Sequence, residues 1–268
     1  MKEKSKTKIK IIRKGCDTKV KCVTTLFRKG ENMSKKKIKR QANFEDKQPT
    51  FSLKRTSPLT KNQEYTFNAY NSGYNLVLNG MAGTGKTFVS LYLALNEVLN
   101  RKTDLEKIII IRSVVPSRDM GFLPGNIKEK IKVYEEPYRE ICNELLGRGS
   151  AYDLLKTKGL VEFTTTSYLR GITFNNAIVI VDEMQNCVLS ELDTTITRLG
   201  DNSRIVFCGD YRQTDLDKAR EKSGLFTFLN ILKRIDSFRY VEFEKEDIIR
   251  SGIVRDYIIS RTEMGIMV

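Results

Sequence analysis

One short segment limits the possible folds of this chain more than any other. It reads Gly-Met-Ala-Gly-Thr-Gly-Lys-Thr over residues 80–87 and fits the pattern G-x-x-x-x-G-K-[ST] throughout. An apolar run over Asn75–Leu78 precedes it, and a stretch of helical period over Thr87–Leu99 follows it. A glycine-rich turn between a strand and a helix points backbone N–H groups inward, and the positive end of the helix favours an anion at the same place. The segment therefore predicts a phosphate-binding loop in an α/β sheet.

The residues of this loop divide between them the contacts that a nucleotide needs. Lys86 would reach the β- and γ-phosphates as a point charge, and the Thr87 hydroxyl would bind Mg²⁺. The backbone before them would surround the phosphate oxygens, and its residues are Gly80, Met81, Ala82, Gly83, Thr84 and Gly85. The alternative, a glycine-rich turn with an incidental lysine, leaves the strand before the loop and the helix after it unexplained.

A second buried strand ends in an acidic pair. The run Ala177–Val181 is followed directly by Asp182 and Glu183. Asp182 would hold Mg²⁺ through water, and Glu183 would act as the general base or orient water for attack on the γ-phosphate. The alternative for Asp-Glu alone is an ordinary polar loop. A carboxylate directly after the metal ligand favours hydrolysis over phosphoryl transfer to a small molecule, because a kinase must keep water away.

A third strand ends in Cys-Gly-Asp-Tyr-Arg-Gln over residues 208–213. Asp210 and Gln213 would leave the carboxyl end of that strand, where open α/β sheets bind ligands. Gln213 could then hydrogen-bond the γ-phosphate or the attacking water, whereas the alternative is a turn with an exposed glutamine. The guanine-reading motif N-K-x-D is absent from the sequence, so ATP is favoured over GTP.

The rest of the body alternates between strand and helix patterns, which predicts an open, mostly parallel α/β sheet with helices on both faces in one domain. Short apolar runs, typical of strands buried on both faces, are Asn75–Leu78, Ile108–Ile111, Ala177–Val181 and Ile205–Cys208. Arg239–Phe243 alternates more and suits an edge strand. Helices are expected over Thr60–Tyr70, with Thr60 as N-cap, and over Thr87–Leu99 and Leu189–Leu199. Residues 113–160 should add helices over the sheet edge.

The net charge of +14 is concentrated at the N-terminus. The first 40 residues hold 16 Lys or Arg and 3 acidic residues, whereas the other 228 hold 31 and 30. We expect a basic, disordered arm over 1–42, an irregular lead-in over 43–58, the domain over 59–262 and a tail over 263–268. The arm is either a solvated stretch or a non-specific phosphate contact, and Met33 is a possible natural start.

Composition excludes several classes of site. The chain has no histidine, which removes imidazole bases, Ser-His-Asp systems and zinc sites that need imidazole. The five cysteines are odd in number and irregularly spaced, which favours a reduced, cytoplasmic protein over a disulfide scaffold. The longest apolar runs fall far short of the roughly 20 residues of a membrane span, so no membrane partner is expected.

Seven stretches together resemble the PhoH family, whose ATPase domain is similar to the first, RecA-like lobe of superfamily 1 helicases. They are Leu59–Gln63, 79–87, Ile108–Gly125, Tyr168–Phe174, Ile180–Asn186, Cys208–Leu216 and Asp247–Ser251. The resemblance covers roughly residues 56–262. It implies ATP binding and hydrolysis, with Gln63 near adenine, and a link to RNA or single-stranded nucleic acid.

The charge that builds on the γ-phosphoryl group needs a cation beyond Lys86 and Mg²⁺. A two-lobed helicase supplies arginines from a second lobe, but only 25 residues follow Phe243 here. Either an arginine folds back within the chain or a neighbouring subunit provides one. The candidates are Arg250, preferred because of its family-like segment, and Arg112, Arg170 and Arg212. A surface arginine paired with an acidic neighbour is the alternative, and a ring-like homo-oligomer, such as a hexamer, is the hypothesis that follows.

Two functions fit these residues. The first is an ATPase that couples hydrolysis to movement or remodelling of RNA or single-stranded DNA. The second is an ATP-switched nucleic-acid-binding module in which the bound state matters more than turnover. A small-molecule kinase fits least well, given Glu183 and the loop after residue 208.

Overall fold

Six parallel strands form one sheet in the computed structural model, which describes residues 51–101, 103–113, 127–211 and 219–264. The strand order is β3-β2-β4-β5-β1-β6, and each neighbouring pair runs parallel. The strands are β1 (Asn75–Gly80), β2 (Lys107–Arg112), β3 (Val161–Thr165), β4 (Ala177–Asp182), β5 (Arg204–Gly209) and β6 (Phe238–Phe243). Because all six are parallel, the loops that follow them begin at one edge of the sheet.

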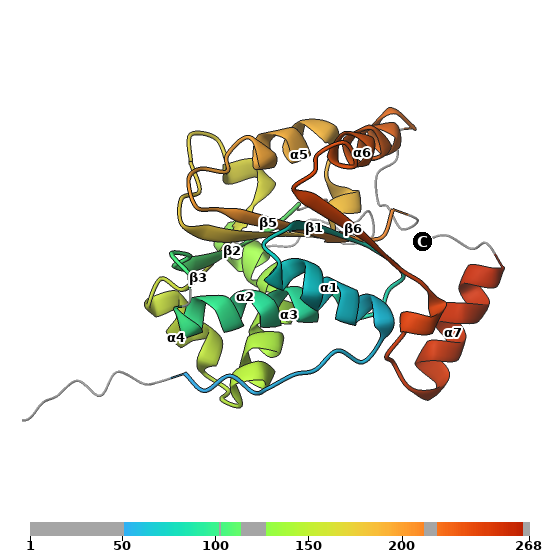
Figure 1. Cartoon of the computed structure of the whole chain (residues 1–268), viewed down its shortest axis with the longest axis horizontal. Coiled ribbons are helices and arrows are strands. Elements are labelled where there is room, and N and C mark those ends of the chain that lie inside the picture. The colour runs from blue at the N-terminus through green and yellow to red at the C-terminus, as the bar shows by residue number, and fades with distance from the viewer. Residues whose placement is uncertain (1–50, 102, 114–126, 212–218, 265–268) are drawn as a thin grey trace, which may run out of the picture. The chain divides into compact units, whose positions relative to one another are not determined.

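Helices cover both faces of the sheet, with α5 and α6 on one side and α1 to α4 on the other (Figure 1). Successive strand residues point to opposite faces, so Leu76 and Leu78 of β1 pack with the α1–α4 core while Val77 packs with the α5–α6 core. The helices are α1 (Lys61–Asn71), α2 (Lys86–Asn100), α3 (Ile127–Leu146), α4 (Ala151–Thr157), α5 (Leu189–Ile196), α6 (Ala219–Leu232) and α7 (Gly252–Glu263).

This architecture confirms the open, parallel α/β sheet with helices on both faces that the sequence predicts. Each of the four predicted core strands is present and is longer than its apolar run by one or two residues. The predicted edge strand is β6, at one end of the sheet. Thr60 caps α1 as expected, because its Oγ1 accepts a hydrogen bond from the Gln63 backbone N–H at 3.3 Å.

The structure differs from the sequence prediction at β3, at the end of α5, and in α6 and α7, which the prediction did not include. The edge strand β3 was not expected, because only its first and last residues, Val161 and Thr165, are buried and its pattern is weakly apolar. Helix α5 ends at Ile196, three residues before the predicted Leu199. The chain tightens there: the backbone N–H of Leu199 bonds to the Ile196 carbonyl, which closes a shorter turn than an α-helix allows.

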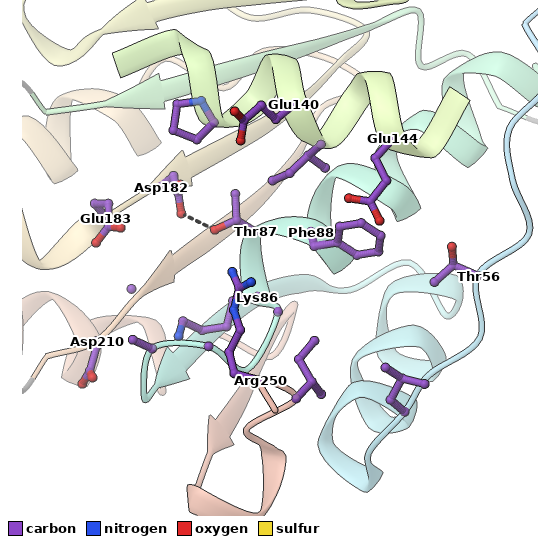
Figure 2. A pocket seen from close by; sticks show the side chains of 18 of the residues that line it. Thr56, Lys86, Thr87, Phe88, Glu140, Glu144, Asp182, Glu183, Asp210 and Arg250 are labelled. Atoms are coloured by element: carbon purple, nitrogen blue, oxygen red, sulfur yellow. Dashed lines mark hydrogen bonds between the residues drawn. The ribbon is translucent and has the colours of Figure 1, made fainter. Parts of the chain in front are cut away.

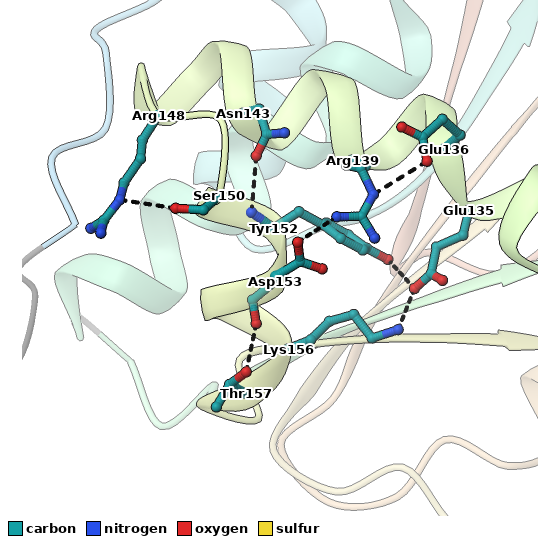
Figure 3. A network of polar contacts seen from close by, with 10 residues as sticks. All are labelled: Glu135, Glu136, Arg139, Asn143, Arg148, Ser150, Tyr152, Asp153, Lys156 and Thr157. Atoms are coloured by element: carbon teal, nitrogen blue, oxygen red, sulfur yellow. Dashed lines mark hydrogen bonds and ion pairs between the residues drawn. The ribbon is translucent and has the colours of Figure 1, made fainter.

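The long connection between β2 and β3 contains the two extra helices that the sequence predicted, α3 and α4. A polar network that includes Arg139, Asp153 and Tyr152 joins these two helices (Figure 3). The irregular lead-in runs beside α3, because the backbone N–H of Lys54 bonds to the Leu145 carbonyl at 2.8 Å. These contacts carry the lead-in to the carboxyl edge of the sheet.

Several predictions lie outside the described residues. They concern the basic arm over 1–42, the first part of the lead-in, Arg212, Gln213 and the end of the tail. Within the described part of the chain, every helix is too short or too polar to cross a membrane.

Candidate nucleotide-binding site

The glycine-rich loop joins the end of β1 to the start of α2 at the carboxyl edge of the sheet. Gly80 has φ +133°, and a Cβ there would lie 2.1 Å from the backbone oxygen of Phe243, so a side chain would collide with β6. Gly85 caps α2 in the left-handed conformation, with φ +83°. The loop therefore follows a path that only glycine permits at these two positions, and it delivers Lys86 and Thr87 to the first turn of α2.

A cavity of about 990 Å³ opens beside this loop. Lys86, Thr87, Asp182, Glu183 and Asp210 line one end of it, and Figure 2 places the three acidic residues on the same side of the loop. The other end is formed by the lead-in, α2 and α3, with Thr56, Phe88, Glu140, Ile141 and Glu144 among its residues. The cavity thus has a charged end at the strand termini and a mixed end beyond it.

Asp182 and Thr87 are joined directly at the charged end. The Thr87 hydroxyl donates to Asp182 Oδ1 at 2.9 Å, and the Tyr138 hydroxyl donates to Asp182 Oδ2 at 2.9 Å (Figure 2 shows the first bond). Among the described residues no group of three or more Asp, Glu, Cys or His gathers to hold a metal ion. One carboxylate and one hydroxyl fit Mg²⁺, which binds through few protein oxygens together with phosphates and water.

The electrostatics of Asp182 reflect its burial. Loss of solvent raises the pKa of this carboxyl, and the adjacent charge of Glu183 raises it further. The hydrogen bonds from Tyr138 and Thr87 and the charge of Arg112 oppose that rise without reversing it. A divalent cation at this position would favour the ionised form strongly, as expected for a metal ligand.

Lys86 lies against its own loop. Its Nζ donates to the backbone oxygens of Gly80 at 2.6 Å and Met81 at 2.8 Å. Burial lowers the pKa of the Lys86 ammonium, while the charges of Asp210 and other nearby acids act in the opposite sense. The ammonium is therefore held at the wall of the cavity by its own loop.

Glu183 and Asp210 are connected through Gln185, which the sequence prediction did not single out. The Gln185 Nε2 donates to Glu183 Oε2, and its Oε1 accepts from the Asp210 backbone N–H at 3.1 Å. Glu183 has φ +53°, an uncommon left-handed backbone for a residue other than glycine. A Cβ on Gly209 would lie 2.5 Å from Gln185 Oε1, so the small residue there makes room for this bridge.

The C-terminal segment folds back onto the loop. The Ile249 backbone N–H donates to the Gly83 carbonyl at 3.1 Å, and the Asn62 Nδ2 donates to Asp247 Oδ2 at 2.7 Å. Arg250 follows directly and lines the cavity beside Lys86 (Figure 2). The preferred arginine therefore lies at the cavity of its own chain, and its action on the γ-phosphoryl group stays a prediction.

The other arginine candidates fall in different places. Arg112, at the end of β2, also lines the cavity, and its guanidinium lies 5.5 Å from the centre of the Tyr134 ring. Arg170 is exposed and does not line the cavity. Arg212 lies outside the described residues, as does Gln213.

Gln63 is buried, and both ends of its amide are bonded within the protein. The Nε2 donates to the Thr84 carbonyl at 3.0 Å, and the Oε1 accepts from the Leu59 backbone N–H at 2.9 Å. The side chain therefore ties α1 and the lead-in to the glycine-rich loop. Its contact with adenine stays a prediction.

A family model described as PhoH-like protein matches residues 55–260. The chain belongs to the PhoH family. A PhoH-like protein of Bacillus subtilis is 36% identical over 180 residues, which are 67% of this chain and 55% of that protein. Protein PhoH of Escherichia coli K12 is 35% identical over 203 residues, which are 74% of this chain and 56% of that protein. The chain spans about half the length of these curated relatives.

Solved structures with a similar fold are more distant in sequence. The SWI2/SNF2 ATPase core of Sulfolobus solfataricus, solved with dsDNA, aligns at 14% identity and a TM-score of 0.44, over 80% of this chain and 58% of that one. The large terminase of a thermophilic bacteriophage aligns at 11% identity and a TM-score of 0.45, over 76% of this chain and 50% of that one.

In this PhoH family member, the sequence prediction missed one whole wall of the cavity. Pro137, Glu140, Ile141 and Glu144 come from α3, and Thr56 comes from the lead-in. Tyr138 of the same helix, which bonds to Asp182, was missed as well. No motif marks them, because they lie in a helix of ordinary period and in a segment without secondary structure. The one available signal was the length of the connection between β2 and β3, which exceeds the needs of a simple crossover.

Proposed function

We propose that this protein binds ATP in the cavity and hydrolyses it with Mg²⁺. One observation carries the proposal: Lys86, Thr87, Asp182 and Glu183 line the same end of one cavity, and Thr87 bonds to Asp182 at 2.9 Å. These are the groups that phosphate binding, metal binding and activation of water require. When bound, Mg²⁺ would neutralise charge on the phosphates, and Thr87 and Asp182 would hold it.

The residues then divide the reaction between them. Lys86 would turn from its own loop to the β- and γ-phosphates, because phosphate oxygens are stronger acceptors than carbonyls. Glu183 would hold the attacking water and accept its proton, and Gln185 would orient Glu183 through its amide. Arg250 would stabilise the charge that develops on the γ-phosphoryl group.

Binding of ATP to the full chain, measured by calorimetry with and without Mg²⁺, tests the first half of this proposal. Lys86→Ala should abolish binding, since the ammonium is the only cation that the loop contributes. Lys132→Ala, an exposed lysine on α3, is the matched control and should bind as the wild type does. Equal affinity of the wild type and Lys86→Ala would refute the assignment of the loop.

We further propose that turnover is coupled to RNA or single-stranded DNA. The support is the PhoH family membership and the 16 basic residues among the first 40, which could neutralise backbone phosphates. The ATPase rate of the full chain, with and without single-stranded RNA and DNA at low salt, is the test. A chain that starts at Met33 separates the first 32 residues from the rest. An unchanged rate with both nucleic acids would contradict the coupling.

A variant of Glu183 separates a motor from an ATP-switched module. Glu183→Gln should keep ATP binding and stop turnover under either function. If the protein is a motor, the variant loses strand displacement. If it is a switch, the variant instead stays bound to nucleic acid in the presence of ATP. The wild type is the matched comparison, because a switch that can hydrolyse ATP should release the nucleic acid.

We also propose a homo-oligomeric ring in which α7 contacts a second copy of the chain. None of the residues of α7 is buried, and Ile253 is 83% exposed and Tyr257 64% exposed on the same side of the helix. A helix of twelve residues with such a face is marginal by itself in water. Its Ile258 lies beside Gly83 of the loop, so a partner on α7 would sit near the nucleotide.

The mass of the protein in solution with ATP and Mg²⁺ tests the ring. Ile253→Asp should lower the mass to that of a single chain, and Ser260→Asp, an exposed polar position of α7, should not. A wild-type protein that is a monomer and fully active would refute the proposed ring. It would leave the ATP site untouched, because Arg250 already reaches that cavity from the same chain.

The cysteines support a proposed place in the cytoplasm. Cys142, Cys187 and Cys208 are free and buried, and burial raises the pKa of the Cys142 thiol to about 12. Such thiols behave as small apolar side chains and suit a reducing compartment. Fractionation of cells that express a tagged chain tests this, and a secreted or membrane-bound protein would contradict it.

A further inference from the structure

Helix α3 contacts Asp182 through the side chain of Tyr138. Tyr138 is fully buried, and its hydroxyl donates to Asp182 Oδ2 at 2.9 Å. The other oxygen of the same carboxylate accepts from Thr87 at 2.9 Å. The two hydroxyl donors therefore hold the carboxylate from both sides, and together they fix its rotation about the bond to Cβ.

A positive charge lies behind this hydroxyl. Arg112, at the end of β2, interacts with the Tyr138 hydroxyl and with the charges of Asp182 and Glu183. The guanidinium, the hydroxyl and the carboxylate thus interact with one another, and they come from β2, α3 and β4. A guanidinium carries donors only, so it can donate to the hydroxyl oxygen but cannot accept from it, and the hydroxyl proton goes to Asp182.

The helix that carries Tyr138 is also a wall of the cavity. Two neighbours of Tyr138 on α3 line the cavity: Pro137, which directly precedes it, and Ile141, three residues later. Pro137 has no N–H, so the helix lacks one internal hydrogen bond at this point and can bend there. The position of the wall and the orientation of Asp182 are thus set by consecutive residues.

We propose that Tyr138 is a positioning residue for the metal: it holds Asp182 so that Oδ1 faces Thr87, and it makes Mg²⁺ binding depend on the placement of α3. This inference rests on the proposed Mg²⁺-ATP site. A purely structural role is the competing explanation, because the Tyr138 ring also packs against Phe163 with centroids 5.6 Å apart. Tyr138→Phe separates the two explanations, since it keeps the ring and removes only the hydroxyl.

The experiment follows binding of a fluorescent ATP analogue to the full chain, in EDTA and over a Mg²⁺ titration. Tyr138→Phe should bind the analogue in EDTA within about twofold of the wild type. Its half-saturating Mg²⁺ concentration should rise by about tenfold or more, as is usual when the partner of a metal ligand is lost. In an Asp182→Asn background the same change should have no further effect, because the carboxylate that Tyr138 holds is gone.

Tyr152→Phe is the matched control. Tyr152 is another fully buried tyrosine, and its hydroxyl donates to a carboxylate, Glu135 Oε1, at 2.7 Å, within the network between α3 and α4 (Figure 3). It does not line the cavity. The control should leave both the EDTA affinity and the Mg²⁺ titration unchanged.

Four results would overturn the inference. The first two are a Mg²⁺ titration of Tyr138→Phe that superimposes on that of the wild type, and an equal shift of the half-saturating Mg²⁺ concentration in Tyr152→Phe. The third is a full further shift when Tyr138→Phe is added to Asp182→Asn. The fourth is loss of analogue binding by Tyr138→Phe in EDTA, which would assign Tyr138 a structural role. Failure of the proposed function looks different, because the wild type itself would then show no tightening by Mg²⁺. That result would remove the inference together with the site.

Discussion

The hydrogen bond between Asn62 and Asp247 should decide whether the C-terminal segment stays on the glycine-rich loop. Asp247 is buried, and its Oδ2 accepts from Asn62 Nδ2 at 2.7 Å and from the Glu244 backbone N–H at 2.9 Å. Asn62→Ala removes the first donor and leaves the second in place. The carboxylate, which starts the segment leading to Arg250, then loses its attachment to α1.

The magnitude follows from the kind of bond that is lost. Hydrogen bonds to charged groups contribute about 1.5–3 kcal/mol, and the site is largely shielded from water, so we expect a loss of about 2 kcal/mol in the free energy of unfolding. A double-mutant cycle with Asp247→Ala, which removes the acceptor, should give a coupling energy of at least about 1 kcal/mol between the two positions. Asn68→Ala, an exposed position on the same helix, should change stability by less than about 0.5 kcal/mol.

Turnover should fall together with stability, because Arg250 is placed by this segment. The backbone bond from Ile249 to Gly83 remains, so we expect a smaller loss of kcat than in Arg250→Ala. Urea unfolding and steady-state ATPase assays of Asn62→Ala, Asn68→Ala and Arg250→Ala measure both effects. A coupling energy below about 0.3 kcal/mol, with kcat unchanged, would refute the view that this bond holds the segment.

Three other perturbations probe separate parts of the site. Gly80→Ala should lower the free energy of unfolding, measured in urea, by more than about 1 kcal/mol and should weaken ATP binding, because φ is +133° there and the new Cβ would collide with the Phe243 backbone oxygen. An unchanged stability would contradict the geometry. ATP affinity should begin to fall at a pH below 10.5, the ordinary pKa of lysine, since burial lowers the pKa of Lys86 and the amine therefore loses its charge at a lower pH than in solution. An ATP affinity that stays constant across the alkaline range would contradict this. Arg204→Met should cost about 3 kcal/mol of stability, because the largely buried Glu97 carboxylate loses its cation and keeps only the Tyr70 and Thr103 hydroxyls as donors. ATP affinity of the folded protein should stay the same, and a loss of affinity in the folded variant would contradict this expectation.

The sequence predicts those parts of the fold that local pattern determines. Continuous apolar runs such as Ala177–Val181 identify the buried central strands, and the loop over 80–87, with its strand before and helix after, predicts the phosphate site. Strand β3 escaped prediction because an edge strand needs few apolar residues. Apolar runs therefore identify the buried strands and alternation identifies the edge strand β6, whereas β3 shows neither signal.

The remaining part of the site depends on contacts between distant segments. Tyr138 is an ordinary core residue of a helix by its pattern, and only the packing of α3 brings its hydroxyl to Asp182. The contact of Gln63 with adenine stays a prediction, and its amide bonds to Leu59 and Thr84 are a second role that the sequence did not indicate. No local signal encodes such pairings, because side-chain partners far apart in sequence are fixed by the tertiary fold.

The central claim is that this PhoH family protein hydrolyses ATP through Glu183 in a cavity built by Lys86, Thr87 and Asp182. The most direct measurement is the Mg²⁺-dependent release of phosphate by the wild type and by Glu183→Gln, with ATP binding measured on the same samples. Glu106→Gln is the control, because Glu106 is exposed and does not line the cavity. The account predicts that Glu183→Gln binds ATP as the wild type does and loses about 100-fold or more in kcat, while Glu106→Gln keeps both. Equal turnover in the wild type and Glu183→Gln would contradict it.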